Sequence, residues 1–232
     1  MYEQLDQTQL LEQIKQIIKS KNWYALTESN RFVWEKSVEL MAGMISKEIK
    51  HIEPQQIREI IENSFDTEAL SKINSEYFID CLLKIDPNLI VWSEGDPDWQ
   101  QLKANKTGLL NRSGLKTEFI NKDKTTKLKD LILSLTNESE DKICILIIDD
   151  KVKNLNCAIN LQEQIANDDA VIRTFQLNLQ SIETNPTACL AFIATIPEKN
   201  IRIIVDMDGV LVDTNRILAE IVSQKLAKIL ET

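Results

Sequence analysis

The first 86 residues carry apolar side chains at helical spacing. Residues 10–18 and 34–49 each repeat an apolar position every three or four residues, which places those side chains on one face of a helix. Pro54 suits the first turn of a third helix, and residues 69–82 show the same periodicity as a fourth. We therefore expect residues 1–86 to form a helical module.

From Pro87 onward the pattern changes to short apolar runs, each followed by an amphipathic stretch. This alternation is typical of βαβ units and of a parallel sheet. The expected strands are residues 88–92, 116–120, 143–148, 171–175 and 202–205. The expected helices cover roughly 98–106, 124–135, 153–166, 186–195 and 215–230.

Acidic and small polar residues follow three of these strands. Ser93 follows the first strand, Asp149 and Asp150 follow the third, and Asp206 and Asp208 follow the last. Ligands of open α/β sheets bind beyond the carboxyl ends of the strands, and a divalent cation makes such a cluster of carboxylates tolerable. We therefore expect these acidic and small polar residues to converge at the carboxyl edge of the sheet.

Composition and charge argue against two classes of function, nucleic-acid binding and membrane insertion. The chain has 232 residues, 43% of them hydrophobic, a formal charge of -9 and a sequence pI of about 4.8. This charge opposes binding to nucleic-acid backbones. No apolar run is long enough to span a bilayer, so we expect no membrane partner and, by default, a cytoplasmic location.

The residue inventory excludes several kinds of active site. His51 is the one histidine, so Ser-His-Asp triads, Cys-His pairs and multi-histidine zinc sites are close to excluded. Four scattered cysteines form no CxxC pair and are expected to be free thiols. Catalysis must therefore use carboxylates, Lys, Ser/Thr or a bound metal.

The segment IRIIVDMDGVLVDT, residues 201–214, is the strongest chemical signal. Asp206 stands at the end of an apolar strand, and Asp208 follows two residues later, where Gly209 lets the backbone turn sharply. A β-hairpin turning at Asp208-Gly209 is the competing interpretation. A calcium loop is disfavoured because the D-x-D-x-D-G ladder and its terminal Glu are missing.

This segment resembles the first motif of the haloacid dehalogenase (HAD) superfamily. The matching positions are Asp206, Asp208, Gly209, Val210, Leu211, Asp213 and Thr214. The strand NLIVWSEGD resembles the second motif, which ends in Ser93, and ICILIIDDKVKNL resembles the fourth, with Asp149 and Asp150. The third motif requires a lysine, for which Lys124 is the first choice and Lys127 the second.

The motifs run in the order second, third, fourth, first, whereas the family runs first to fourth. The resemblance therefore implies a circularly permuted HAD-like Rossmannoid core over residues 87–214. The permuted order implies that Ser93, Asp149, Asp150 and Asp206 meet at one sheet edge, with the last strand between the first and the third. Residues 1–86, completed by the C-terminal helix 215–232, would form an all-helical cap, because cap insertions follow the first motif and exposed loops tolerate such cuts.

The resemblance implies a Mg²⁺-dependent phosphatase that acts on a small phosphomonoester through an aspartyl-phosphate. Asp206 is the implied nucleophile and Asp208 the acid and base. The implied phosphate-binding positions are Ser93, Glu94, Gly95 and Lys124, and the implied metal ligands are Asp206, the backbone carbonyl of Asp208, Asp150 and, assisting, Asp149. A phosphotransferase or mutase, or a non-catalytic HAD-like binding or regulatory module, are the alternatives.

Overall fold

The chain forms two units. The computed structural model describes residues 7–20, 22, 25, 33–49, 52–65, 76–120, 124–138, 142–164, 170–179, 185–208, 210–211 and 214–230. One unit comprises residues 1–73 and 214–232, and the other comprises residues 74–213.

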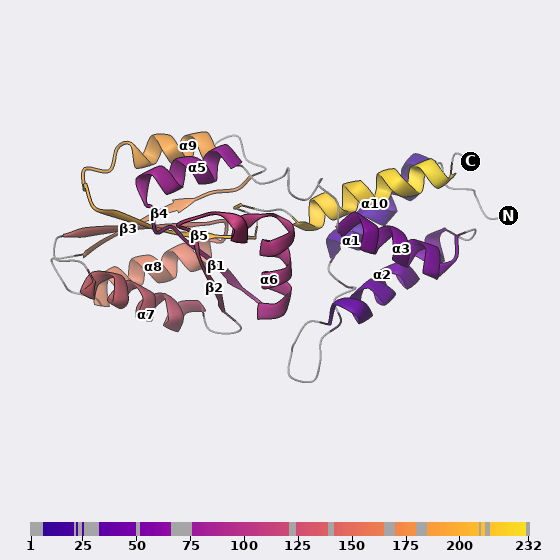
Figure 1. The fold of residues 1–232 in the computed structure, drawn as a ribbon, viewed down its shortest axis with the longest axis horizontal. Coiled ribbons are helices and arrows are strands. Elements are labelled where there is room, and N and C mark those ends of the chain that lie inside the picture. Colours follow the sequence, from indigo (N-terminus) through magenta and orange to yellow (C-terminus); the bar gives the residue numbers. More distant parts are fainter. Residues whose placement is uncertain are drawn as a thin grey trace. The chain divides into compact units, whose positions relative to one another are not determined.

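The second unit is built on a five-stranded parallel sheet with the strand order β2-β1-β5-β3-β4 (Figure 1). Its strands are β1 (Ile90–Glu94), β2 (Lys116–Ile120), β3 (Ile143–Asp149), β4 (Ala170–Gln176) and β5 (Ile201–Asp206). The strand at residues 201–206 therefore lies between those at 90–94 and 143–149, which confirms the predicted central position of the last strand.

Helices cover both faces of this sheet. Figure 1 shows α5 (Glu76–Ile85) and α9 (Pro186–Ile193) on one face, and α7 (Lys124–Asn137) and α8 (Val152–Gln164) on the other. Alternate residues of β5 enter the two cores: Val205 packs with the first pair of helices and Ile204 with the second. A central strand buried on both faces explains the continuous apolar run in its sequence.

The strands extend further than their sequence patterns predict. Ser93 and Glu94 are part of β1, and Asp149 and Asp206 are the last residues of β3 and β5. The ladder continues past Asp206, because the Met207 amide donates to the carbonyl oxygen of Trp92 at 3.0 Å. Polar side chains therefore lie inside the carboxyl ends of the strands.

Helix α5 belongs to the sheet unit and not to the helical module, which corrects the boundary expected at residue 86. Its apolar residues Phe78, Ile79 and Leu82 are buried in the core that contains β1 and β5. An amphipathic pattern shows that a helix has an apolar face, but it does not show which partner covers that face.

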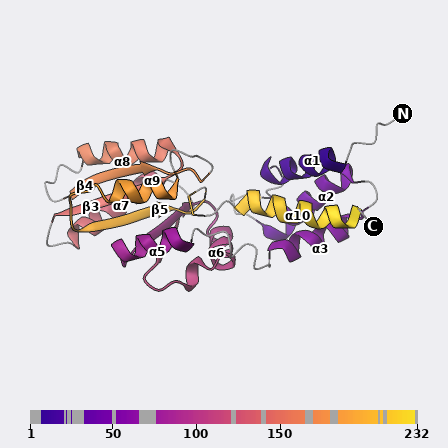
Figure 2. The same ribbon diagram turned by 90° about the horizontal axis from the view of Figure 1, so that it is seen from above.

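The helical unit draws on both ends of the chain. It contains α1 (Gln7–Ser20), α2 (Trp34–Glu48), α3 (Pro54–Phe65) and α10 (Thr214–Leu230). Helix α10 contacts α1 and α3, and Figure 2 shows it alongside both. Leu218, Val222 and Leu226 form its buried stripe.

No helix in the described part of the chain is long and apolar enough to cross a membrane. All four cysteines are free thiols, as the sequence predicted.

Candidate functional site

Three carboxylates meet at the carboxyl edge of the sheet. Asp149 ends β3, Asp206 ends β5 and Asp150 follows Asp149. The two strands are parallel neighbours, so their carboxyl ends lie together, and one carboxylate oxygen from each residue lies within 4.8 Å of the others. Asp149 and Asp206 are 0% and 2% exposed. This buried acidic cluster can bind a metal ion.

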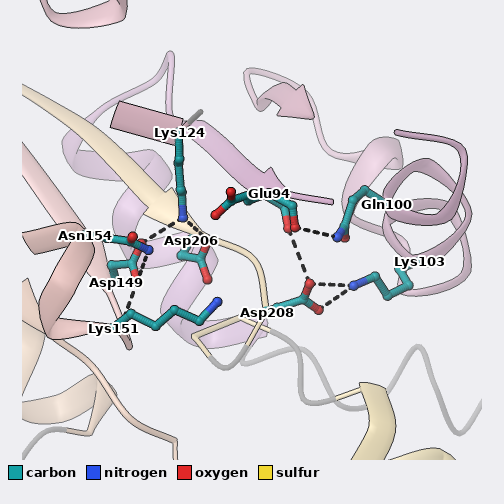
Figure 3. Close-up of polar contacts among 10 residues, drawn as sticks. Glu94, Gln100, Lys103, Lys124, Asp149, Lys151, Asn154, Asp206 and Asp208 are labelled. Carbon is teal, nitrogen blue, oxygen red and sulfur yellow. Dashed lines mark hydrogen bonds and ion pairs between the residues drawn. The ribbon is translucent and has the colours of Figure 1, made fainter. Parts of the chain in front are cut away.

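Lys124 neutralises part of the charge of this cluster. It is the first residue of α7, and its Nζ lies 2.6 Å from Oδ1 of Asp206 and 2.8 Å from Oδ2 of Asp149 (Figure 3). Its Nζ also lies 4.2 Å from the centre of the Trp92 ring. Burial alone would lower the pKa of Lys124, but the two carboxylates outweigh it and raise that pKa. Lys127 is exposed, so the geometry favours Lys124 as the lysine at this site.

Asp149 is fully hydrogen-bonded. Asn154 donates from Nδ2 to both carboxylate oxygens at 3.0 and 2.9 Å, and the Lys151 amide donates to Oδ1 at 2.9 Å. Together with the Lys124 ammonium, these donors fix the orientation of the carboxylate. Asp149 therefore serves to position Lys124 and the start of α8 as well as to add charge.

Asp206 and Asp150 each retain a buried carboxylate oxygen without a hydrogen-bond partner among the described residues, Oδ2 and Oδ1 respectively. Burial raises the pKa of Asp206 to about 7, although Lys124 opposes the shift. Burial likewise raises the pKa of Asp150, with Asp149 adding to the effect and Lys151 opposing it. A cation at these two oxygens would satisfy both and favour the ionised carboxylates.

Asp208 lies apart from the acidic cluster and faces a second lysine. Its two carboxylate oxygens lie 2.6 and 2.5 Å from Nζ of Lys103, and Oδ2 accepts the Ser93 hydroxyl at 3.3 Å. Figure 3 shows Asp208 turned toward Lys103 and Asp206 turned toward Lys124. The Asp208 side chain is therefore not a member of the three-carboxylate group, and its expected metal contact through the backbone carbonyl stays a prediction.

The backbone amide of Gly95, one of the expected phosphate-binding positions, is engaged within the sheet. The Gly95 amide donates to the carbonyl oxygen of Ile120 at 2.9 Å, so it is engaged in the sheet. The Glu94 side chain is exposed, and its carbonyl oxygen accepts from Gln100 Nε2 at 3.1 Å. Of the four expected phosphate-binding positions, Ser93 and Lys124 place side chains at the site.

Lys103 was not predicted from the sequence as a residue of the site. It lies on α6 (Pro97–Lys106), which buries the polar side chains of Gln100 and Lys103. The available signal was the absence of an apolar stripe in DPDWQQLKANK, because a helix packed only for stability presents apolar residues to its core. Two other first-motif positions, Gly209 and Asp213, lie outside the described residues.

Comparisons with protein-family models, with curated proteins and with solved structures found no match to this chain. What the site can do therefore follows from its own residues. They form a buried acidic cluster with one lysine, and a separate carboxylate that contacts a second lysine and the Ser93 hydroxyl.

Proposed function

We propose that this chain is a Mg²⁺-dependent phosphatase that hydrolyses a small phosphomonoester through an aspartyl-phosphate at Asp206. One observation carries the proposal. Asp206 ends the central strand with one carboxylate oxygen on Lys124 and the other buried and unpartnered among the described residues, inside a cluster able to bind a metal ion. A carboxylate that attacks phosphorus needs a fixed orientation, which Lys124 supplies at Oδ1 and a cation would supply at the unpartnered Oδ2.

The proposal includes membership of the HAD superfamily with the motifs circularly permuted and the helical unit acting as a cap. The strand order supports it. The strand that ends in Asp206 lies between the strand that carries Ser93 and the strand that ends in Asp149. Lys124, the third-motif residue, contacts the first-motif and fourth-motif carboxylates. This meeting of segments that lie far apart in the sequence supports the proposed motif order.

Magnesium fits the donor set better than a softer metal, because the cluster offers oxygen ligands alone. Asp206, Asp150 and the Asp208 backbone carbonyl would hold the ion, with Asp149 assisting. When bound, Mg²⁺ would offset the negative charge of the carboxylates and of the incoming phosphate.

In the first step a carboxylate oxygen of Asp206 attacks the substrate phosphorus in line, and the bond from phosphorus to the leaving oxygen breaks. Asp208 donates a proton to that oxygen, while the Ser93 hydroxyl and the Lys124 ammonium bind the other phosphoryl oxygens. In the second step Asp208 takes a proton from water, which attacks phosphorus. Phosphate leaves, and the Asp206 carboxylate is restored.

Hydrolysis of p-nitrophenyl phosphate tests this proposal. We expect turnover with Mg²⁺, none with EDTA, and none for Asp206→Asn, because an amide is a poor nucleophile. Asp130→Asn is the matched control, since Asp130 is exposed on α7, and it should keep the wild-type rate. Wild-type turnover by Asp206→Asn, with the control behaving as expected, would contradict the assignment of the nucleophile.

A further inference from the structure

Helix α6 buries a charged side chain beside the site. Lys103 is 4% exposed, and lysines are almost never so deeply buried unless they are paired. Its ammonium contacts both carboxylate oxygens of Asp208, at 2.6 and 2.5 Å, whereas the Asp208 side chain itself is 34% exposed. The buried lysine is therefore the fixed member of the pair, and the partly exposed carboxylate is the member that it holds.

The position of Lys103 is set by the end of β1. Asp96 caps α6 by accepting the Trp99 amide at 3.0 Å. Gln100 ties the same helix to the Glu94 carbonyl oxygen at 3.1 Å. These contacts lie directly after Ser93, so the lysine is placed relative to the serine hydroxyl by the backbone of the β1–α6 connection.

Two lysines, each on a different helix, thus hold the side chains of Asp206 and Asp208 apart, although these aspartates are only two residues apart in sequence. Lys124 of α7 contacts Asp206, and Lys103 of α6 contacts Asp208 (Figure 3). The Ser93 hydroxyl gives Asp208 a further contact at 3.3 Å. Asp208 is consequently held on the Ser93 side, apart from the acidic cluster.

We propose that Lys103 is the positioning residue of Asp208, holding this carboxylate where the leaving oxygen departs. The catalytic consequence rests on the proposed function. A general acid must lie within hydrogen-bond reach of the leaving oxygen, and misplacement of a catalytic group by about 1 Å can lower a rate on the order of 100-fold. A carboxylate with a third of its surface in solvent requires such a partner to keep one rotamer.

The first test compares two phosphate esters in the presence of Mg²⁺. Phenolate is a poorer leaving group than p-nitrophenolate and depends more on protonation. Lys103→Gln should lower kcat about 100-fold on phenyl phosphate, at the lower end of what a general acid contributes, and only about 10-fold on p-nitrophenyl phosphate. It should leave KM nearly unchanged. Lys103→Arg should recover part of both rates. Lys127→Gln removes the same charge from an exposed position and should change neither.

The second test places Lys103→Gln in an Asp208→Asn background. If the lysine acts through Asp208, the double variant should hydrolyse phenyl phosphate at the rate of Asp208→Asn alone. An equal fold loss from Lys103→Gln in both backgrounds would overturn the proposal, as would an unaltered kcat for Lys103→Gln on both esters.

A third readout does not depend on activity. Thermal unfolding in EDTA of the wild type, both single variants and the double variant measures the coupling between the two side chains. The double variant should melt at a higher temperature than additive shifts predict, because Asp208→Asn alone leaves a buried ammonium without this carboxylate. Additive shifts would overturn the pairing. A wild type that hydrolyses neither ester but shows the coupling would contradict the proposed function, and with it the catalytic role of Lys103, but not the pairing itself.

Discussion

The ammonium of Lys124 lies 2.6 Å from Oδ1 of Asp206, which joins the start of α7 to the end of the central strand. The same ammonium lies 2.8 Å from Asp149 on the neighbouring strand. One buried cation therefore ties together three segments, and it stands between two carboxylates that would otherwise repel each other.

Removal of this cation should destabilise the protein. Lys124→Met leaves Asp149 and Asp206 buried without the ammonium, and we expect the free energy of unfolding at pH 8 to fall by about 3 kcal/mol. At pH 5 the loss should be smaller, because Asp206 then takes up a proton. Urea unfolding measures both values. Lys127→Met, at an exposed position of the same helix, is the control, and an equal loss for it would contradict the role given to Lys124.

The metal-free protein should lose stability as the pH rises from about 4 to about 7. Burial raises the pKa of Asp206 from its ordinary value of 3.8 to about 7, so the native state binds this proton more tightly than the unfolded chain does. The unfolding free energy then falls across that interval, and the penalty is complete above pH 7. Thermal melts in EDTA should show a shallower decline for Asp206→Asn and a higher melting temperature at pH 8. A lower melting temperature for this variant at pH 8 would contradict the account.

Magnesium should reverse this loss. An ion at the unpartnered oxygens of Asp206 and Asp150 binds the native state, and it should add about 2.7 kcal/mol of stability at a concentration 100 times its dissociation constant. The gain should be larger at pH 8 than at pH 5, because protons compete for the same carboxylates. Asp150→Asn should reduce the magnesium-induced shift in melting temperature, and Asp130→Asn should not. Equal shifts in both variants would remove Asp150 from the ligand set.

Periodicity and motif order together located much of the site before its geometry was known. The apolar run at residues 202–205 predicted a strand of a parallel sheet, and β5 is the central strand of that sheet. Asp149, Asp150 and Asp206 were expected at one edge because each lies at or just after the end of an apolar run, and they do meet there.

Contacts that depend on tertiary packing could not be predicted from the sequence. Lys103 lies in a polar segment, in which a lysine is expected to be exposed to solvent. It is buried because α6 packs against the end of β1. Gly95 was assigned to phosphate binding from its place after Ser93, but strand pairing with β2 engages its amide. Likewise, the partner of α5 followed from the fold and not from its amphipathic pattern.

A side chain at Gly95 should strain the backbone and displace the end of the Gln100 side chain. Its φ is +148°, and an added Cβ would lie 2.5 Å from Nε2 of Gln100. Gly95→Ala should therefore lower the unfolding free energy by about 1–3 kcal/mol and disturb the anchoring of α6. Gly43→Ala is the control. Gly43 lies inside α2 with nothing within 4 Å of an added Cβ, so this change should stabilise by about 0.5–1 kcal/mol. Urea unfolding of both variants measures these changes. An unchanged free energy of unfolding for Gly95→Ala would contradict the packing described.

Trapping of the covalent intermediate tests the central claim most directly. The protein would be mixed with p-nitrophenyl phosphate and Mg²⁺, quenched in acid and reduced with borohydride, which converts an aspartyl-phosphate to homoserine. Peptide mass spectrometry should then find homoserine at position 206 in the wild type. It should be absent when EDTA replaces Mg²⁺ and in Asp206→Asn. Homoserine at another aspartate, or Mg²⁺-dependent turnover that persists in Asp206→Asn, would contradict Asp206 as the nucleophile.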